Sequence, residues 1–157
     1  MAYDFRQIHA KSVDDLEGPH PAAPFASPLI ERIARARRVP LGQLSTETLR
    51  LLVSQRQALS YTLPVTLARL EEDPFAEGDM YRGDLLMAFL QCEAVWPNES
   101  GFLSRARALI TSALQALEDL RPVDWAGGEI PALDALTEVD RDNLAPAMRD
   151  ALTRIGQ

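Results

Sequence analysis

Residues 101–120 read GFLSRARALITSALQALEDL, and this stretch carries the clearest helical signal in the chain. Apolar side chains recur along it every three or four residues, which is the spacing of one face of an α-helix. Arg121-Pro122 follows and ends the pattern, because proline cannot continue a helix. The stretch predicts a long amphipathic helix with an apolar face formed by Leu103, Ala106, Ile110, Ala113, Leu114, Leu117 and Leu120.

Two helices are predicted upstream, each from a serine that precedes an apolar period. Ser27-Pro28 is typical of a helix start, with serine as the N-cap and proline at the first position, and Pro40 ends this helix. Ser45 caps the next helix, which the pattern extends to about Ala58.

Three further helices complete the set. One has Pro64 in its first turn and ends at Glu71-Glu72-Asp73-Pro74. Asp84 is placed to cap a short helix that continues to about Glu93. The last helix covers about residues 144–155.

No segment alternates as a half-buried strand does, so the sequence predicts an all-α fold. Residues 1–157 are expected to form a single-domain bundle of about six helices. Residues 1–27 are predicted as an irregular N-terminal segment, in which Ser12 to Gly18 makes one short helical turn. Residues 122–139 are predicted as an irregular connector before the C-terminal helix.

Charge and composition exclude several classes of function. The net charge is −7, and residues 59–104 alone hold 2 basic and 8 acidic groups. Nucleic-acid binding needs clustered lysine and arginine, so no nucleic-acid partner is expected. No apolar run is long enough for a membrane helix and the N-terminus lacks a secretory signal, so we expect a cytoplasmic protein.

Signals of catalysis and of cofactor binding are weak. His9 and His20 have no second ligand at metal-binding spacing, and the single cysteine, Cys92, is expected to be a small buried apolar residue. No glycine-rich phosphate-binding motif is present. We therefore expect no catalytic residue, no cofactor and no metal.

The tightest carboxylate cluster is Glu71-Glu72-Asp73. With Asp79 or Asp84 it forms a candidate Mg²⁺ site, which is the basis for an enzyme as one alternative. A solvated helix end is the second interpretation. Acids at a helix C-terminus oppose the helix dipole, which favours a third interpretation, a surface that binds a protein partner.

Residues 39–90 contain an ordered string of motifs. It includes Pro40-Leu41-Gly42, Leu63-Pro64, Ala76-Glu77-Gly78-Asp79 and Tyr81-x-Gly83-Asp84-Leu85-Leu86, and Lys11-Ser12-x-x-x-Leu16-Glu17-Gly18 precedes it. The string resembles the immunity proteins of contact-dependent growth inhibition (CDI) systems over about residues 11–90. The sequence departs from that family at Ala58-Leu59-Ser60-Tyr61, where the family favours Gly-Leu-Pro-Tyr, and the tail after Gly128 does not match.

The resemblance implies a function without catalysis. A CDI immunity protein binds the C-terminal toxin domain of its own strain's CDI surface protein and neutralises it stoichiometrically, by masking the active or substrate-binding site. Many of these toxins are nucleases with basic surfaces, so an acidic partner gains from charge complementarity. The alternatives are an acidic helical adaptor or regulator that binds another cytoplasmic protein, and the Mg²⁺-dependent enzyme.

The toxin-binding surface is expected in the acidic middle segment. Its predicted residues are Glu71, Glu72, Asp73, Glu77, Asp79, Tyr81 and Asp84. The same loop also has a structural interpretation, in which Gly78 and Gly83 adopt positive φ and Asp79 and Asp84 cap turns. Trp96 and Trp125 lie in breaks between helices, where each is either an aromatic anchor for a partner or a packed residue.

Overall fold

Regular secondary structure in this protein is helical throughout the part that the structure describes. The computed structural model describes residues 5–21, 24–119 and 138–156, and these hold no strand beyond an isolated bridge between Ser12 and Pro40. The α-helices are α1 (Phe5–His9), α2 (Val13–Glu17), α3 (Pro28–Ala36), α4 (Thr46–Ser54), α5 (Leu59–Glu72), α6 (Asp84–Gln91), α7 (Ser100–Asp119) and α8 (Glu138–Ile155). Two short 3₁₀ turns are η1 (Leu41–Gln43) and η2 (Glu93–Val95). The all-α prediction is confirmed, and the six predicted helices correspond to α3–α8.

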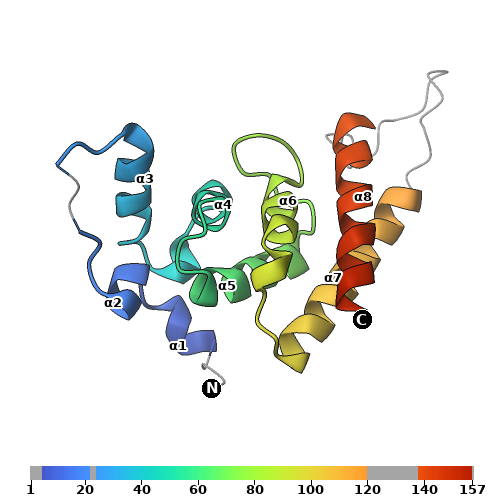
Figure 1. Cartoon of the computed structure of the whole chain (residues 1–157), viewed down its shortest axis with the longest axis horizontal. Helices are drawn as coiled ribbons and strands as arrows, with labels where there is room; N and C mark the ends of the chain where they lie inside the picture. Colours follow the sequence, from blue (N-terminus) through green and yellow to red (C-terminus); the bar gives the residue numbers. More distant parts are fainter. Residues whose placement is uncertain (1–4, 22–23, 120–137, 157) are drawn as a thin grey trace.

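Helix α5 lies at the centre of the arrangement. It contacts α1, α4, α6, α7 and η1 (Figure 1). Helix α3 lies at one end of the molecule, and the α7–α8 pair lies at the other. A helix with neighbours on several sides must be apolar around most of its circumference, and α5 meets this requirement. Its buried residues are Thr62, Leu63, Val65, Thr66, Leu67 and Leu70.

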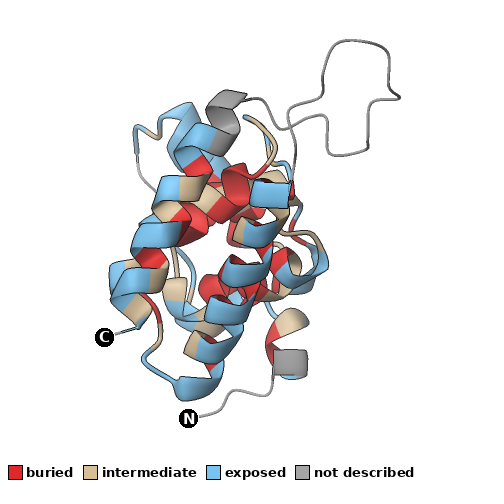
Figure 2. Cartoon of the chain, turned by 90° about the vertical axis from the view of Figure 1, so that its right-hand side faces the viewer, coloured by how far each residue is buried: buried red, intermediate tan, exposed pale blue. Residues whose placement is uncertain are grey.

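The buried side chains form one continuous apolar cluster that extends from the N-terminal helices to α8. Figure 2 shows that the buried residues lie where the helices face one another, while the outer faces of α7 and α8 are exposed. An aromatic group strengthens the centre: the Trp96 ring stacks on Phe89 at 4.4 Å and meets Phe102 edge-on at 6.1 Å. The Trp96 indole N–H donates to the Phe89 carbonyl at 3.0 Å, so the polar end of the ring is satisfied inside the core.

Serine caps fix where three helices begin. Ser27 and Ser45 accept hydrogen bonds from the amides three residues later, at 3.3 and 3.1 Å, which confirms both predicted N-caps. Ser12 and Asp15 form a reciprocal capping box at the start of α2. The Ser12 amide and hydroxyl hold the pKa of Asp15 below its usual value.

The prediction of an irregular segment over residues 1–27 was incomplete: the short helical turn expected between Ser12 and Gly18 is α2, but α1 was not predicted. Five-residue helices are too short to show a period, so only the caps of α2 mark them in the sequence. Arg37, which is 5% exposed, attaches α2 to the body. Its guanidinium lies 3.0 Å from Asp14, 3.2 Å from Glu17 and 3.5 Å from the Gln57 side-chain oxygen. These contacts satisfy a buried cation that would otherwise be costly.

The predicted boundary between the second and third helices was wrong. Helix α4 ends at Ser54 and not near Ala58, and α5 begins at Leu59. Arg56 and Ala58 between them adopt left-handed conformations, with φ of 52° and 48°. Pro64 is consequently the sixth residue of α5 and not in its first turn. It forgoes a hydrogen bond only to the carbonyl of Ser60, which is an exposed residue.

Two other helix starts differ from the prediction. Helix α8 begins at Glu138, within the predicted connector of residues 122–139, and continues through Pro146. The remainder of that connector, residues 122–137, lies outside the described residues. The N-cap of α6 is Gly83, with φ of 88°, and not Asp84. The carboxylate of Asp84 is engaged elsewhere, as described below.

The left-handed Ala58 leads to a stability prediction. A residue with a Cβ atom loses about 1–2 kcal/mol in this conformation, and glycine loses about 0.4–1 kcal/mol through the unfolded chain. Ala58→Gly is therefore expected to raise the free energy of unfolding by roughly 0.5–1 kcal/mol. Urea denaturation measures the change. The control, Ala108→Gly on the exposed face of α7, should lower stability by about 1 kcal/mol, and a loss of stability in both variants would contradict the prediction.

The burial of Cys92 leads to a second prediction. Its side chain is 2% exposed and its Sγ lies 3.6 Å from the Val53 carbonyl. Burial raises the pKa of the Cys92 thiol, so little of the reactive thiolate exists at neutral pH. In the folded protein, we expect a disulfide reagent to modify Cys92 at least about tenfold more slowly than a free thiol. Denaturant should restore full reactivity, whereas an equal rate in the folded state would show that the thiol is accessible.

Candidate functional site

The seven residues predicted to bind a toxin all lie along one connection between two helices. Glu71 and Glu72 end α5, Asp84 begins α6, and the loop of residues 73–83 carries the other four (Figure 1). All seven therefore belong to one continuous segment of the chain, residues 71–84. Their environments differ, and three groups can be separated by what each carboxylate contacts.

Asp84 is inside the molecule, with its side chain 3% exposed. Its carboxylate accepts hydrogen bonds from the backbone amides of Gly78 at 2.6 Å, Asp79 at 3.1 Å and Met80 at 3.0 Å. The Arg50 Nε of α4 lies 3.4 Å from the same carboxylate. Asp84 thus closes the loop of residues 73–83 onto the body of the protein.

The glycines of the loop serve two different purposes. Gly83 has φ of 88°, as predicted, and a Cβ there would lie 2.8 Å from a methyl group of Leu144. Gly78 is not at positive φ, so that prediction was wrong. It is required because a Cβ would lie 2.9 Å from the Asp84 carboxylate and 3.1 Å from the Arg50 side chain. Glycine occupies position 78 because the backbone there approaches the buried carboxylate closely, and not because of its backbone conformation.

Glu71 and Asp73 face arginines of the same chain. Arg105 of α7 binds Glu71 through two parallel contacts, at 2.8 and 2.5 Å. Asp73 lies 3.5 Å from Arg82 and accepts a hydrogen bond from the Phe75 amide at 3.1 Å. Both carboxylates therefore contribute to holding the ends of the loop.

Glu72, Glu77 and Asp79 form the third group. All three are exposed, and among the described residues none of them takes part in an ion pair. Met80, which was not among the predicted residues, directly follows Asp79 and is 67% exposed. An apolar residue inside an otherwise acidic loop was the available signal. Tyr81 is half-buried. We name Glu72, Glu77, Asp79 and Met80 the acidic contact patch.

The two tryptophans do not extend this patch in the described part of the chain. Trp96 is 8% exposed and packs in the core, which corresponds to the packed-residue interpretation. Trp125 lies outside the described residues.

The described residues do not bring three histidine, cysteine, aspartate or glutamate side chains together as metal ligands. Two of the three clustered carboxylates, Glu71 and Asp73, face arginines instead. No helix in the described ranges is both long enough and apolar enough to cross a membrane.

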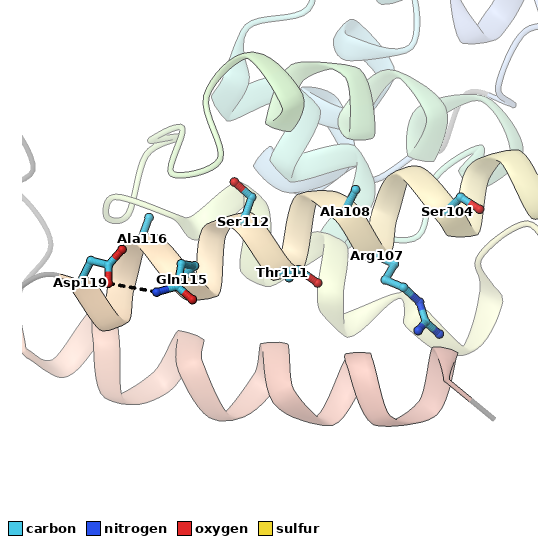
Figure 3. A pocket seen from close by; sticks show the side chains of 8 residues that line it. All are labelled: Ser104, Arg107, Ala108, Thr111, Ser112, Gln115, Ala116 and Asp119. Atoms are coloured by element: carbon cyan, nitrogen blue, oxygen red, sulfur yellow. Dashed lines mark hydrogen bonds between the residues drawn. The ribbon is translucent and has the colours of Figure 1, made fainter.

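A shallow depression follows the surface of α7, as Figure 3 shows. Its lining is small and polar, with Ser104, Ala108, Thr111 and Ser112 among the contributors, and Gln115 donates to Asp119 at 3.0 Å. All of the lining residues belong to this one helix. The depression is therefore an open helix face and offers no converging groups for a small ligand.

Comparison with known proteins matches residues 16–105 to one family, described as CDI immunity proteins. No curated protein and no solved structure matched the chain. The matched range covers more than half of the 157 residues and includes the central helix α5, the loop of residues 73–83 and Arg105. The chain belongs to the family of CDI immunity proteins.

Proposed function

We propose that this protein neutralises the C-terminal toxin domain of its cognate CDI surface protein, a basic nuclease, by binding it stoichiometrically through the acidic contact patch. The observation that carries the proposal is the combination of family membership with three exposed carboxylates that have no partner among the described residues. Binding covers the active or substrate-binding surface of the toxin. The encounter takes place in the cytoplasm, where a nuclease toxin finds its substrates.

Charge supports this partner class. Residues 59–104 carry most of the acidic excess, and the acidic contact patch lies within them. Exposed carboxylates without a counter-charge in the described residues attract a basic surface and accelerate the encounter by electrostatic steering. A carboxylate that is paired within the chain attracts a basic partner less strongly. Glu71 is an example, because Arg105 compensates its charge.

Met80 adds an apolar contact to the charged side chains of the acidic contact patch. An exposed apolar side chain surrounded by polar ones is the usual composition of an interface centre with a charged rim. Met80 is flexible and polarisable, so it adapts to an irregular apolar surface on the partner. The acidic contact patch therefore combines long-range attraction with a short-range contact.

Stoichiometric inhibition is the first prediction from this proposal. The protein mixed with the toxin domain encoded next to its gene should elute from a sizing column as a 1:1 complex. In a nuclease assay, toxin activity should fall linearly and reach zero at equimolar protein. Inhibition by far less than one equivalent would instead indicate catalytic inactivation of the toxin.

Charge reversal tests the surface. Glu72→Lys with Asp79→Lys should weaken toxin binding at least about tenfold at low salt and reduce its dependence on ionic strength, because two attractive charges become repulsive. The matched control is Glu31→Lys with Asp150→Lys, which changes the same number of charges at exposed positions on α3 and α8. Calorimetry at several salt concentrations gives both quantities. Equal behaviour of the two variants would reject the acidic contact patch.

A further inference from the structure

We infer that Asp84 is a positioning residue. With Arg50 as its counter-charge, it holds residues 78–80, the apex of the loop, in the conformation that binds the toxin, and it does so before the toxin binds. This inference rests on the proposed function, because it concerns the same loop. It assigns a separate role to a residue that does not itself touch the partner.

Three backbone amides of the loop are directed inward, toward the Asp84 carboxylate. The three amides that Asp84 accepts belong to consecutive residues, Gly78, Asp79 and Met80. Successive amides directed at one anion form a concave nest, and the anion fixes the backbone around it. The side chains of Asp79 and Met80 are exposed, although their amides bond to the buried carboxylate. Fixing these amides therefore fixes where two members of the acidic contact patch emerge.

Arg50 provides the counter-charge of Asp84. A buried carboxylate needs compensation, and Arg50 of α4 lies 3.4 Å away. Among the described residues, the buried Arg50 Nε forms no hydrogen bond. The carboxylate thus directs its hydrogen bonds to the loop, while Arg50 acts as a nearby charge. This division suits a group whose task is to organise backbone amides.

The backbone of the loop lies directly against the Asp84–Arg50 ion pair. A Cβ at Gly78 would lie 2.9 Å from the Asp84 carboxylate and 3.1 Å from the Arg50 side chain. A rigid loop loses less conformational freedom on binding than a mobile one, and this difference appears as affinity. The position of Asp84 therefore contributes to toxin binding without any contact with the toxin.

The test uses the full chain and the toxin domain encoded next to its gene. Asp84→Asn removes the charge and leaves one acceptor oxygen for three amides. We expect hydrogen exchange of the Gly78, Asp79 and Met80 amides to accelerate while the helical amides stay protected. Toxin affinity should fall at least about tenfold, and its salt dependence should stay unchanged because no exposed charge is altered.

A second variant keeps the question answerable if Asp84→Asn fails to fold. Gly78→Ala leaves Asp84 and Arg50 in place but displaces the loop, and the same loss of amide protection and affinity is expected. Its matched control is Gly101→Ala in the first turn of α7, where an added Cβ meets nothing within 4 Å. That control should change neither quantity.

The outcomes separate the two proposals. Faster exchange at the apex with unchanged toxin affinity would overturn the positioning role of Asp84, and so would unchanged exchange. If the Glu72→Lys and Asp79→Lys variant still weakens binding in either case, the proposed contact surface stands. If that variant binds normally while Asp84→Asn or Gly78→Ala weakens binding, the loop matters but its acidic side chains do not provide the contact.

Discussion

The burial of α5 among α1, α4, α6 and α7 is the constraint on which the other elements depend. A central helix must enter and leave the core at fixed points. At its start, the left-handed residues Arg56 and Ala58 turn the chain sharply from α4 into α5. At its end, the paired contact between Glu71 and Arg105 joins it to α7. The loop of residues 73–83 begins directly after this contact, so the first residues of the loop are attached to α7.

The helices were largely predictable because each carries a local signal. Apolar periodicity located α7, and the serine caps located the starts of α3 and α4. The α4–α5 boundary was not predictable, because alanine and arginine do not announce a left-handed turn as glycine does. The assignment of Asp84 as the N-cap of a helix was wrong for a related reason. An aspartate before an apolar run is typical of an N-cap, but its actual partners are Arg50, far back in the sequence, and three loop amides.

In the candidate site too, local sequence patterns did not reveal partners that are distant in sequence, here the arginines that pair with the carboxylates. The sequence indicated one acidic surface of seven residues. It does not show which of the carboxylates form ion pairs within the protein. Arg105, Arg82 and Arg50 engage three of them, and two of these arginines are distant in sequence. The structure separates the carboxylates of this charged segment into two groups. Asp84 and Glu71 attach the loop to the body of the protein, while Glu72, Glu77 and Asp79 are exposed.

The contact between Gly83 and Leu144 has an evolutionary consequence. Gly83 lies inside the range shared with the family, and Leu144 lies beyond it, on α8. A Cβ at position 83 would lie 2.8 Å from a methyl group of Leu144, so the end of the loop packs against the C-terminal helix. The positive φ of Gly83 favours glycine there whatever side chain lies opposite. A relative with a different C-terminal helix is therefore expected to keep this glycine and to change the side chain that packs against it.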